Sequence, residues 1–118
     1  MSKFPIIENC IDKLKEMLNS LQELQRKNEK DDGFNCAVSC IKDSIQTRID
    51  LLNDAIIDND VLGDMNEEAE CIAAITSAIS VLESDVEDAS QNTDFDIAFR
   101  EKIKEFINKF YDILDEYE

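Results

Sequence analysis

Residues 38–56 run VSCIKDSIQTRIDLLNDAI, and the pattern of this stretch decides the fold class. Its apolar side chains recur at intervals of three or four residues, which places them on one face of a helix. They are Val38, Ile41, Ile45, Ile49, Leu52 and Ile56. A row of carboxylates lies on the opposite face: Asp43, Asp50, Asp54 and, just beyond the stretch, Asp58. The segment therefore predicts an amphipathic helix that reaches about Asn59 and has an acidic outer side.

Three further segments show the same helical spacing. The first extends from about Pro5 to Lys30, with an apolar stripe at Ile7, Ile11, Leu14, Leu18 and Leu21. Another follows a joint at Gly63, with a stripe at Met65, Ala69, Ile72, Ile75, Ile79, Leu82 and Val86. The last begins where Thr93 or Asp94 can cap the first amides, and its stripe is Phe99, Ile103, Phe106, Phe110, Ile113 and Tyr117.

The composition is typical of one helical domain. A chain of 118 residues with 43% hydrophobic content is long enough for a single compact domain, residues 1–118. Two glycines and one proline argue against a hairpin-rich β fold and for helices. Short links between long helices favour an all-α fold, an antiparallel up-and-down four-helix bundle about 35 Å long. An open array of helices and a bundle shared between two chains satisfy the same pattern.

Membrane and export signals are not evident in the sequence. No stretch approaches the roughly 20 apolar residues that a membrane span requires. The N-terminal residues MSKFPIIENC lack the apolar region and the cleavage site of a signal peptide. We therefore expect a cytoplasmic protein, with no membrane contact, whose four cysteines are reduced. These are Cys10, Cys36, Cys40 and Cys71.

The stretch DNDVLGDMNEEAE, residues 58–70, resembles a calcium-binding loop, but the match is incomplete. Asp58, Asp60 and Gly63 fit positions one, three and six of such a loop. Leu62 and Ala69 occupy positions five and twelve, which require oxygen ligands. We interpret the stretch as a helix joint, in which Gly63 turns the chain, Asp64 caps the following helix and Glu67 completes the capping arrangement.

The residues needed for catalysis or for a metal centre are not present in recognisable patterns. The chain has no histidine, no glycine-rich phosphate loop and no paired nucleophile and base. Cys36 and Cys40 lie four residues apart on one side of a helix, but Cys10 and Cys71 provide no matching pair for a zinc site. We therefore expect no enzyme activity, no metal and no cofactor.

Charge is the most informative feature. The chain has 28 acidic and 12 basic residues, a net charge of −16. The 51 residues between Arg48 and Arg100 contain 14 acids and no Lys, Arg or His. Over about 35 Å the net charge corresponds to roughly one charge per 2 Å, against one per about 1.7 Å in duplex DNA. The predicted partner-binding acids are Asp43, Asp50, Asp54, Asp58, Asp60, Asp64, Glu67, Glu68, Glu83, Glu87, Glu101, Glu105, Asp112 and Glu116.

This profile is similar to that of small phage or mobile-element proteins that mimic DNA and block restriction or CRISPR effectors, and the similarity covers size, helicity and charge. It implies an inhibitor whose acidic helix faces occupy the basic surface of a nucleic-acid-binding protein. Direct binding of nucleic acid is disfavoured because the net charge repels phosphate. The same composition is also expected of an acidic bundle whose charge is simply exposed to solvent and has no binding role.

A second hypothesis rests on the apolar character of the third segment. Its small side chains can admit a close neighbour, either a partner of an adaptor or chaperone or a second copy in a homodimer. They are Cys71, Ala74, Ala78 and Val81. Because the segment is apolar on many sides, we expect it either at the centre of the bundle or at a subunit contact.

Overall fold

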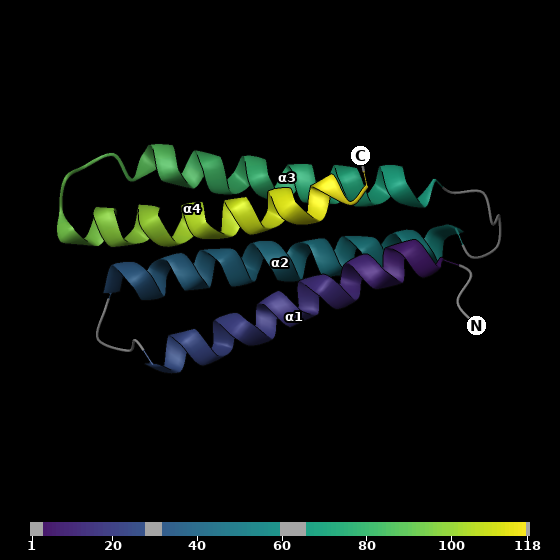
Figure 1. The fold of residues 1–118 in the computed structure, drawn as a ribbon, viewed down its shortest axis with the longest axis horizontal. Coiled ribbons are helices and arrows are strands. Elements are labelled where there is room, and N and C mark those ends of the chain that lie inside the picture. Colours follow the sequence, from purple (N-terminus) through teal and green to yellow (C-terminus); the bar gives the residue numbers. More distant parts are fainter. Residues whose placement is uncertain (1–3, 28–31, 60–65, 118) are drawn as a thin grey trace.

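Four α-helices pack side by side as a bundle in a computed structural model, which describes residues 4–27, 32–59 and 66–117 (Figure 1). The helices are α1 (Pro5–Lys27), α2 (Asp32–Asn59), α3 (Glu67–Asp88) and α4 (Asp94–Asp115). No strand occurs within these ranges. The prediction of an all-α four-helix bundle is therefore confirmed. None of the described helices combines the length and the apolar character needed to cross a bilayer.

Successive helices in Figure 1 run back along one another, so the N-termini of α1 and α3 lie at one end and those of α2 and α4 at the other. Helices α2 and α4 approach closely at Gly33, in the first turn of α2. A Cβ atom at this position would overlap the backbone carbonyl oxygen of Phe95. Glycine is therefore required here by the contact between α2 and α4.

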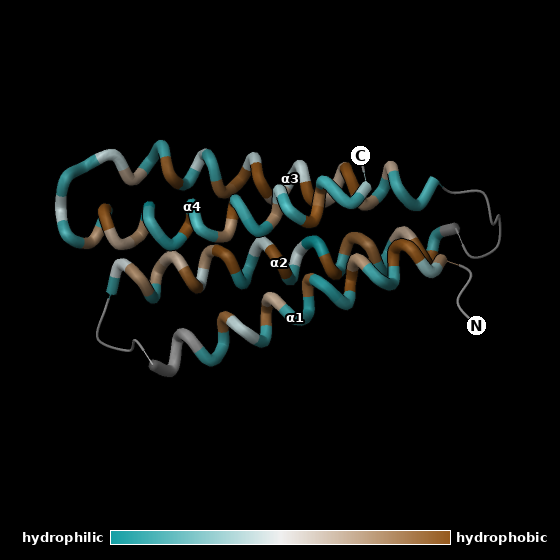
Figure 2. The backbone as a smooth tube through the Cα atoms, in the orientation of Figure 1, coloured by the Kyte–Doolittle hydropathy of each residue, from teal (hydrophilic) through white to brown (hydrophobic). Residues whose placement is uncertain are grey.

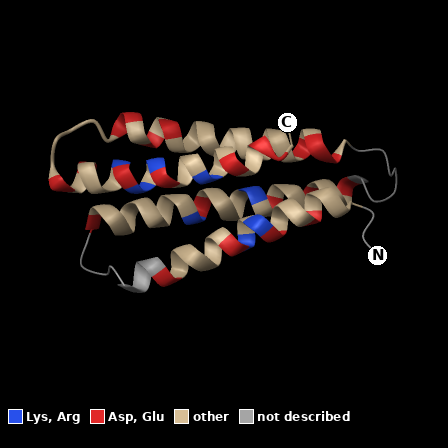
Figure 3. Ribbon diagram, in the orientation of Figure 1, with Lys and Arg blue, Asp and Glu red and all other residues tan. Residues whose placement is uncertain are grey.

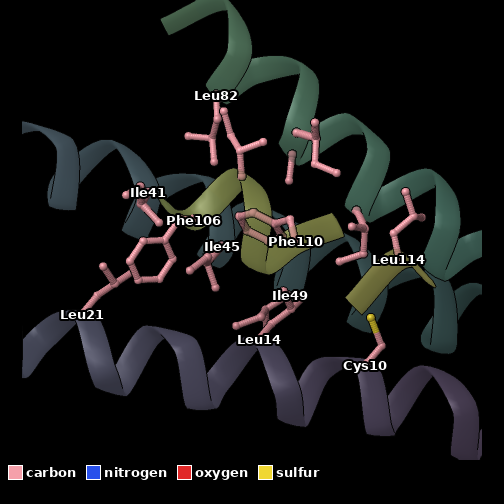
Figure 4. Close-up of a cluster of buried hydrophobic side chains, with 14 of the residues drawn as sticks. Cys10, Leu14, Leu21, Ile41, Ile45, Ile49, Leu82, Phe106, Phe110 and Leu114 are labelled. Atoms are coloured by element: carbon pink, nitrogen blue, oxygen red, sulfur yellow. The ribbon is translucent and has the colours of Figure 1, made fainter. Parts of the chain in front are cut away.

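The core contains most of the predicted stripes, but Ala69 is exposed and Met65 lies outside the described residues. Figure 2 shows apolar residues recurring along all four helices, and Figure 4 shows Phe106 and Phe110 of α4 among buried side chains of α1, α2 and α3. Both rings are fully buried, as are Leu14, Ile45 and Leu82. Burial of each such side chain stabilises the fold by about 1.5–3 kcal/mol. Because these contacts join all four helices, the bundle is closed by one continuous core.

The small residues predicted on the third segment are divided between the core and the surface. Cys71 and Ala78 are fully buried, and Ala74 is partly buried against the core. Val81 is 44% exposed. Two of the four side chains proposed for a subunit contact are therefore already used inside this single chain.

The start of α3 differs from the prediction. Asn66, not Asp64, caps this helix, and its Oδ1 accepts a hydrogen bond from the Ala69 amide at 3.1 Å. Asparagine satisfies a first-turn amide as well as aspartate does, so the helix begins at Glu67. Asp64 itself lies outside the described residues. The cap of α4 agrees with the prediction, since Thr93 Oγ1 accepts from the Asp96 amide at 3.2 Å.

The role expected for Glu67 was also wrong. Its carboxylate accepts hydrogen bonds from the amides of Ile6 and Ile7, at 3.1 and 3.4 Å, rather than capping its own helix. Those amides belong to the first turn of α1, where no intrahelical acceptor exists. The first residue of α3 therefore caps α1.

Candidate functional site

The acidic row of α2 lies on the solvent side, as the periodicity predicts. Asp43, Asp50, Asp54 and Asp58 are all exposed. Asp50 accepts a hydrogen bond from Gln46 Nε2 at 3.0 Å, and none of the four forms an ion pair within the described chain. Four residues of helix separate the last three carboxylates by about 6 Å each. This row is therefore a line of exposed carboxylates with no ion pair in the described chain, which we call the α2 ladder.

The acidic row of α4 is partly neutralised. Its predicted members Glu101, Glu105, Asp112 and Glu116 are exposed. Lys102 Nζ lies 2.6 Å from a Glu105 oxygen, and Lys13 of α1 forms an ion pair with Glu116. The α4 row therefore presents less free charge than the α2 ladder.

The remaining predicted acids differ in their surroundings. Glu68, Glu83 and Glu87 of α3 are exposed, whereas Glu67 is partly buried in its contact with α1. Tyr111 donates a hydrogen bond to Glu83 at 3.2 Å, and the charge of Glu83 raises the pKa of Tyr111. Asp60 and Asp64 lie outside the described residues.

A further acidic cluster occurs where α3 ends and α4 begins. Asp85 and Asp88 follow Glu83 in the last turns of α3, which contain no basic residue, and Asp96 lies in the first turn of α4. Negative charge at a helix C-terminus is destabilising because it faces the negative end of the macrodipole. Burial, and then the neighbouring Asp88, raise the pKa of Asp85.

These carboxylates border a groove of about 270 Å³, which we call the acidic groove. Its lining is Cys36, Cys40, Asp85, Asp88, Ala89, Phe95, Asp96 and Phe99. The Phe95 ring is 43% exposed and stacks on Phe99, with ring centroids 6.3 Å apart. Burial, and then the charges of Cys36 and Asp85, raise the pKa of Cys40 to about 11. An aromatic floor beside carboxylates is suited to a cationic side chain with an aliphatic stem.

Metal binding finds no support in this arrangement. Within the described residues, no three Cys, Asp or Glu side chains come together closely enough to hold an ion. Cys36 and Cys40 do share one side of α2, as predicted, with Cys36 exposed and Cys40 partly buried.

Basic side chains near the acidic surface are directed to internal contacts. Arg48 is only 7% exposed and its Nε has no hydrogen-bond partner in the described chain. Arg100 donates to the backbone carbonyls of Ala89 and Gln91. Lys109 lies 4.3 Å from the centroid of the Phe106 ring. Figure 3 shows α3 with acidic residues at both ends and no basic residue, so the charge of this helix has no opposing charge within it.

The length of the molecule changes the estimate of charge density. Its longest dimension is 51 Å rather than about 35 Å, because α2 alone has 28 residues and spans about 42 Å. The net charge of −16 then corresponds to about one charge per 3.2 Å. This is lower than in duplex DNA and close to the value of about 3.4 Å per charge along one of its strands.

No protein-family model, curated protein or solved structure matches this chain. The geometry and the charge of the described residues are therefore the basis of the functional proposal.

Proposed function

We propose that the protein is a small acidic inhibitor that binds the basic surface of a nucleic-acid-processing protein, as a nucleic-acid mimic of the kind that blocks restriction or CRISPR effectors. It acts by binding rather than by catalysis, and it does not itself bind nucleic acid. The observation that carries the proposal is the α2 ladder, whose carboxylates are exposed and have no basic partner in the described chain.

The energetic cost of the charge supports a binding role. A small domain remains soluble with a net charge of magnitude roughly 2 to 8, whereas this chain carries −16. Asp85 and Asp88 add negative charge at the end of α3, where it opposes the helix dipole. Neither the excess net charge nor the carboxylates at the end of α3 stabilise the fold. A partner that neutralises this charge on binding would explain why both are present.

The acidic groove offers a specific contact for such a partner. A lysine or arginine side chain can place its stem on Phe95 and its charge beside Asp85 and Asp88. The α2 ladder supplies charges at about 6 Å intervals that match a row of basic residues lining a nucleic-acid groove. Binding of this type is fast at low salt and weakens steeply as salt rises.

The test is a tagged capture from lysate of the source cell or its prey, with mass spectrometry at low and at high salt. We expect a nucleic-acid-binding protein that is released by about 0.5 M salt and displaced by duplex or single-stranded DNA. A partner without a nucleic-acid site, retained at high salt, would contradict the proposal.

Two triple variants with equal changes in net charge make the test specific. The first is Asp50→Lys, Asp54→Lys and Asp58→Lys on the α2 ladder, which we expect to abolish capture while helicity is retained. The control places the same three reversals on exposed acids of α1, at Asp12, Glu16 and Glu23. If both variants bind equally, the ladder is not the interface.

The adaptor or homodimer is the second candidate. Exposed Leu51 and Ile57, at 52% and 69%, border the α2 ladder and supply apolar surface. An apolar contact would survive high salt and would be weakened by polar substitution of these two residues. Burial of Cys71 and Ala78 leaves less apolar surface on α3 than the sequence indicates.

A further inference from the structure

A pair of buried thiols lies where α1 meets α3. The carboxylate of Glu67 holds the start of α1 through the amides of Ile6 and Ile7. Cys10 and Cys71 lie one helical turn beyond these residues, on the same faces. Both are fully buried members of one core, and each thiol shifts the pKa of the other although they lie 61 positions apart in the sequence. Figure 4 shows the Cys10 sulfur pointing from α1 toward the other helices.

The C-terminal turn covers this pair. Tyr117 is partly buried, and its hydroxyl lies beside Cys10 with no hydrogen-bond partner of regular geometry among the described residues. Lys13 Nζ lies 5.6 Å from the centroid of the Tyr117 ring and pairs with Glu116. These three residues also line a surface hollow of about 500 Å³, together with residues of α1 and Glu68. The Tyr117 side chain therefore lies between the buried thiols and this surface hollow.

The two thiols have different acidities. Interaction with the Cys71 thiol, supported by Lys13, lowers the pKa of Cys10 despite its burial. The same interaction and burial raise the pKa of Cys71. Cys10 is therefore the thiol that ionises, and Cys71 is the one that keeps its proton.

We propose that Cys10 and Cys71 form a reversible intramolecular disulfide when a hydroperoxide reaches them through the Tyr117 hollow. Cys10 sulfur attacks the terminal peroxide oxygen, the O–O bond breaks, and Cys10 becomes a sulfenic acid while the other oxygen leaves as an alcohol or, from hydrogen peroxide, as water. Cys71 sulfur then attacks the Cys10 sulfur, the S–O bond breaks, and water leaves with the Cys71 proton. Two thiols lose two electrons and the hydroperoxide gains them.

The disulfide would join α1 covalently to α3. It closes a loop of 61 residues, which restricts the unfolded chain strongly and raises Tm by roughly 10 °C.

The experiment uses the full chain with Cys36→Ser and Cys40→Ser, which leaves Cys10 and Cys71 as its two cysteines. After treatment of the folded protein with hydrogen peroxide, we expect loss of both free thiols, an intact mass lower by two hydrogen atoms and a linked Cys10–Cys71 peptide pair. Dithiothreitol should reverse all three changes, and Tm of the oxidised form should rise. The wild-type chain, mapped in the same way, should give the same linked peptides.

Single-thiol versions test the assignment of roles. With Cys71 also replaced by serine, Cys10 should stop at a sulfenic acid that dimedone traps. With Cys10 replaced instead, Cys71 should react more slowly, because Tyr117 and Lys13 lower the pKa of Cys10 whereas Glu67 and Glu70 raise that of Cys71. The proposed disulfide is excluded if the folded Cys36→Ser, Cys40→Ser protein keeps two free thiols under conditions that oxidise the same protein when it is unfolded in guanidinium. It is also excluded if oxidation yields only disulfide-linked dimers. Equal rates for the two single-thiol proteins would overturn the assignment of Cys10 as the attacking thiol.

Discussion

Replacing Glu67 by alanine would test whether the first residue of α3 holds the start of α1. Glu67 Oε1 accepts hydrogen bonds from the amides of Ile6 and Ile7, at 3.1 and 3.4 Å. Without it, two first-turn amides of α1 lose their side-chain acceptor. The same variant removes a negative charge from the positive end of the α1 dipole.

The size of the effect follows from these contacts. A hydrogen bond to a charged acceptor contributes about 1.5–3 kcal/mol, but the second one here is long and water can reach the partly buried carboxylate. The helix-end charge adds about 0.3–1 kcal/mol. We therefore expect E67A to lower the free energy of unfolding by about 2 kcal/mol, and E67Q, which keeps an acceptor without charge, by about half as much.

Urea unfolding followed by circular dichroism measures these differences. The matched control is Glu68→Ala, an exposed neighbour in the same helical turn, for which we expect a change within about 0.5 kcal/mol. Amide exchange of Ile6 and Ile7 should accelerate in E67A and remain unchanged in the control. Equal stability of E67A and E68A would refute the assignment of Glu67 as the cap of α1.

Three further predictions concern packing, pH and salt. Ala78→Glu should destabilise the fold by about 3 kcal/mol or more, because Ala78 is fully buried. Val81→Glu should change thermal stability little, because Val81 is 44% exposed. Equal melting curves for the two variants would contradict this placement of the side chains. Burial and Asp88 raise the pKa of Asp85, so the fold is more stable when Asp85 is protonated and loses this stability as pH rises through the pKa of the folded state. Asp85→Asn should therefore raise Tm at neutral pH, and this difference from wild type should disappear below pH 3.8. Glu87→Gln, with the same change in charge, serves as its control, and identical pH profiles would count against the burial of Asp85. Raising NaCl to about 0.5 M should increase Tm by screening repulsion among the acids, and a decrease would show that attractive pairs dominate.

Periodicity predicted most of the core because helical spacing alone places a side chain on a face. Ile7, Ile45 and Phe106, chosen from their intervals, are fully buried. The N-cap at Thr93 was also predictable, since a hydroxyl can accept from an amide three residues later in the same segment. The exposure of the α2 ladder follows from the same spacing.

Contacts between distant segments could not be obtained in this way. The pairing of Cys10 with Cys71 depends on how α1 settles against α3, and no local pattern records that register. The need for glycine at residue 33 likewise arises from Phe95, on another helix. A local signal for the acidic groove was present, however, because Asp85 and Asp88 end a helix that lacks a basic last turn.

The distribution of positive charge bears on the proposal that the acidic surface binds a basic partner. If negative charge served only solubility, the basic residues would be expected to pair with acids on the surface and reduce repulsion. Arg48 is instead buried and Arg100 binds two backbone carbonyls, whereas Lys13 and Lys102 pair with Glu116 and Glu105 of the α4 row. Under the proposal, the α2 ladder is therefore the favoured docking face, because the ion pairs of the α4 row would have to be broken before a basic partner could dock there.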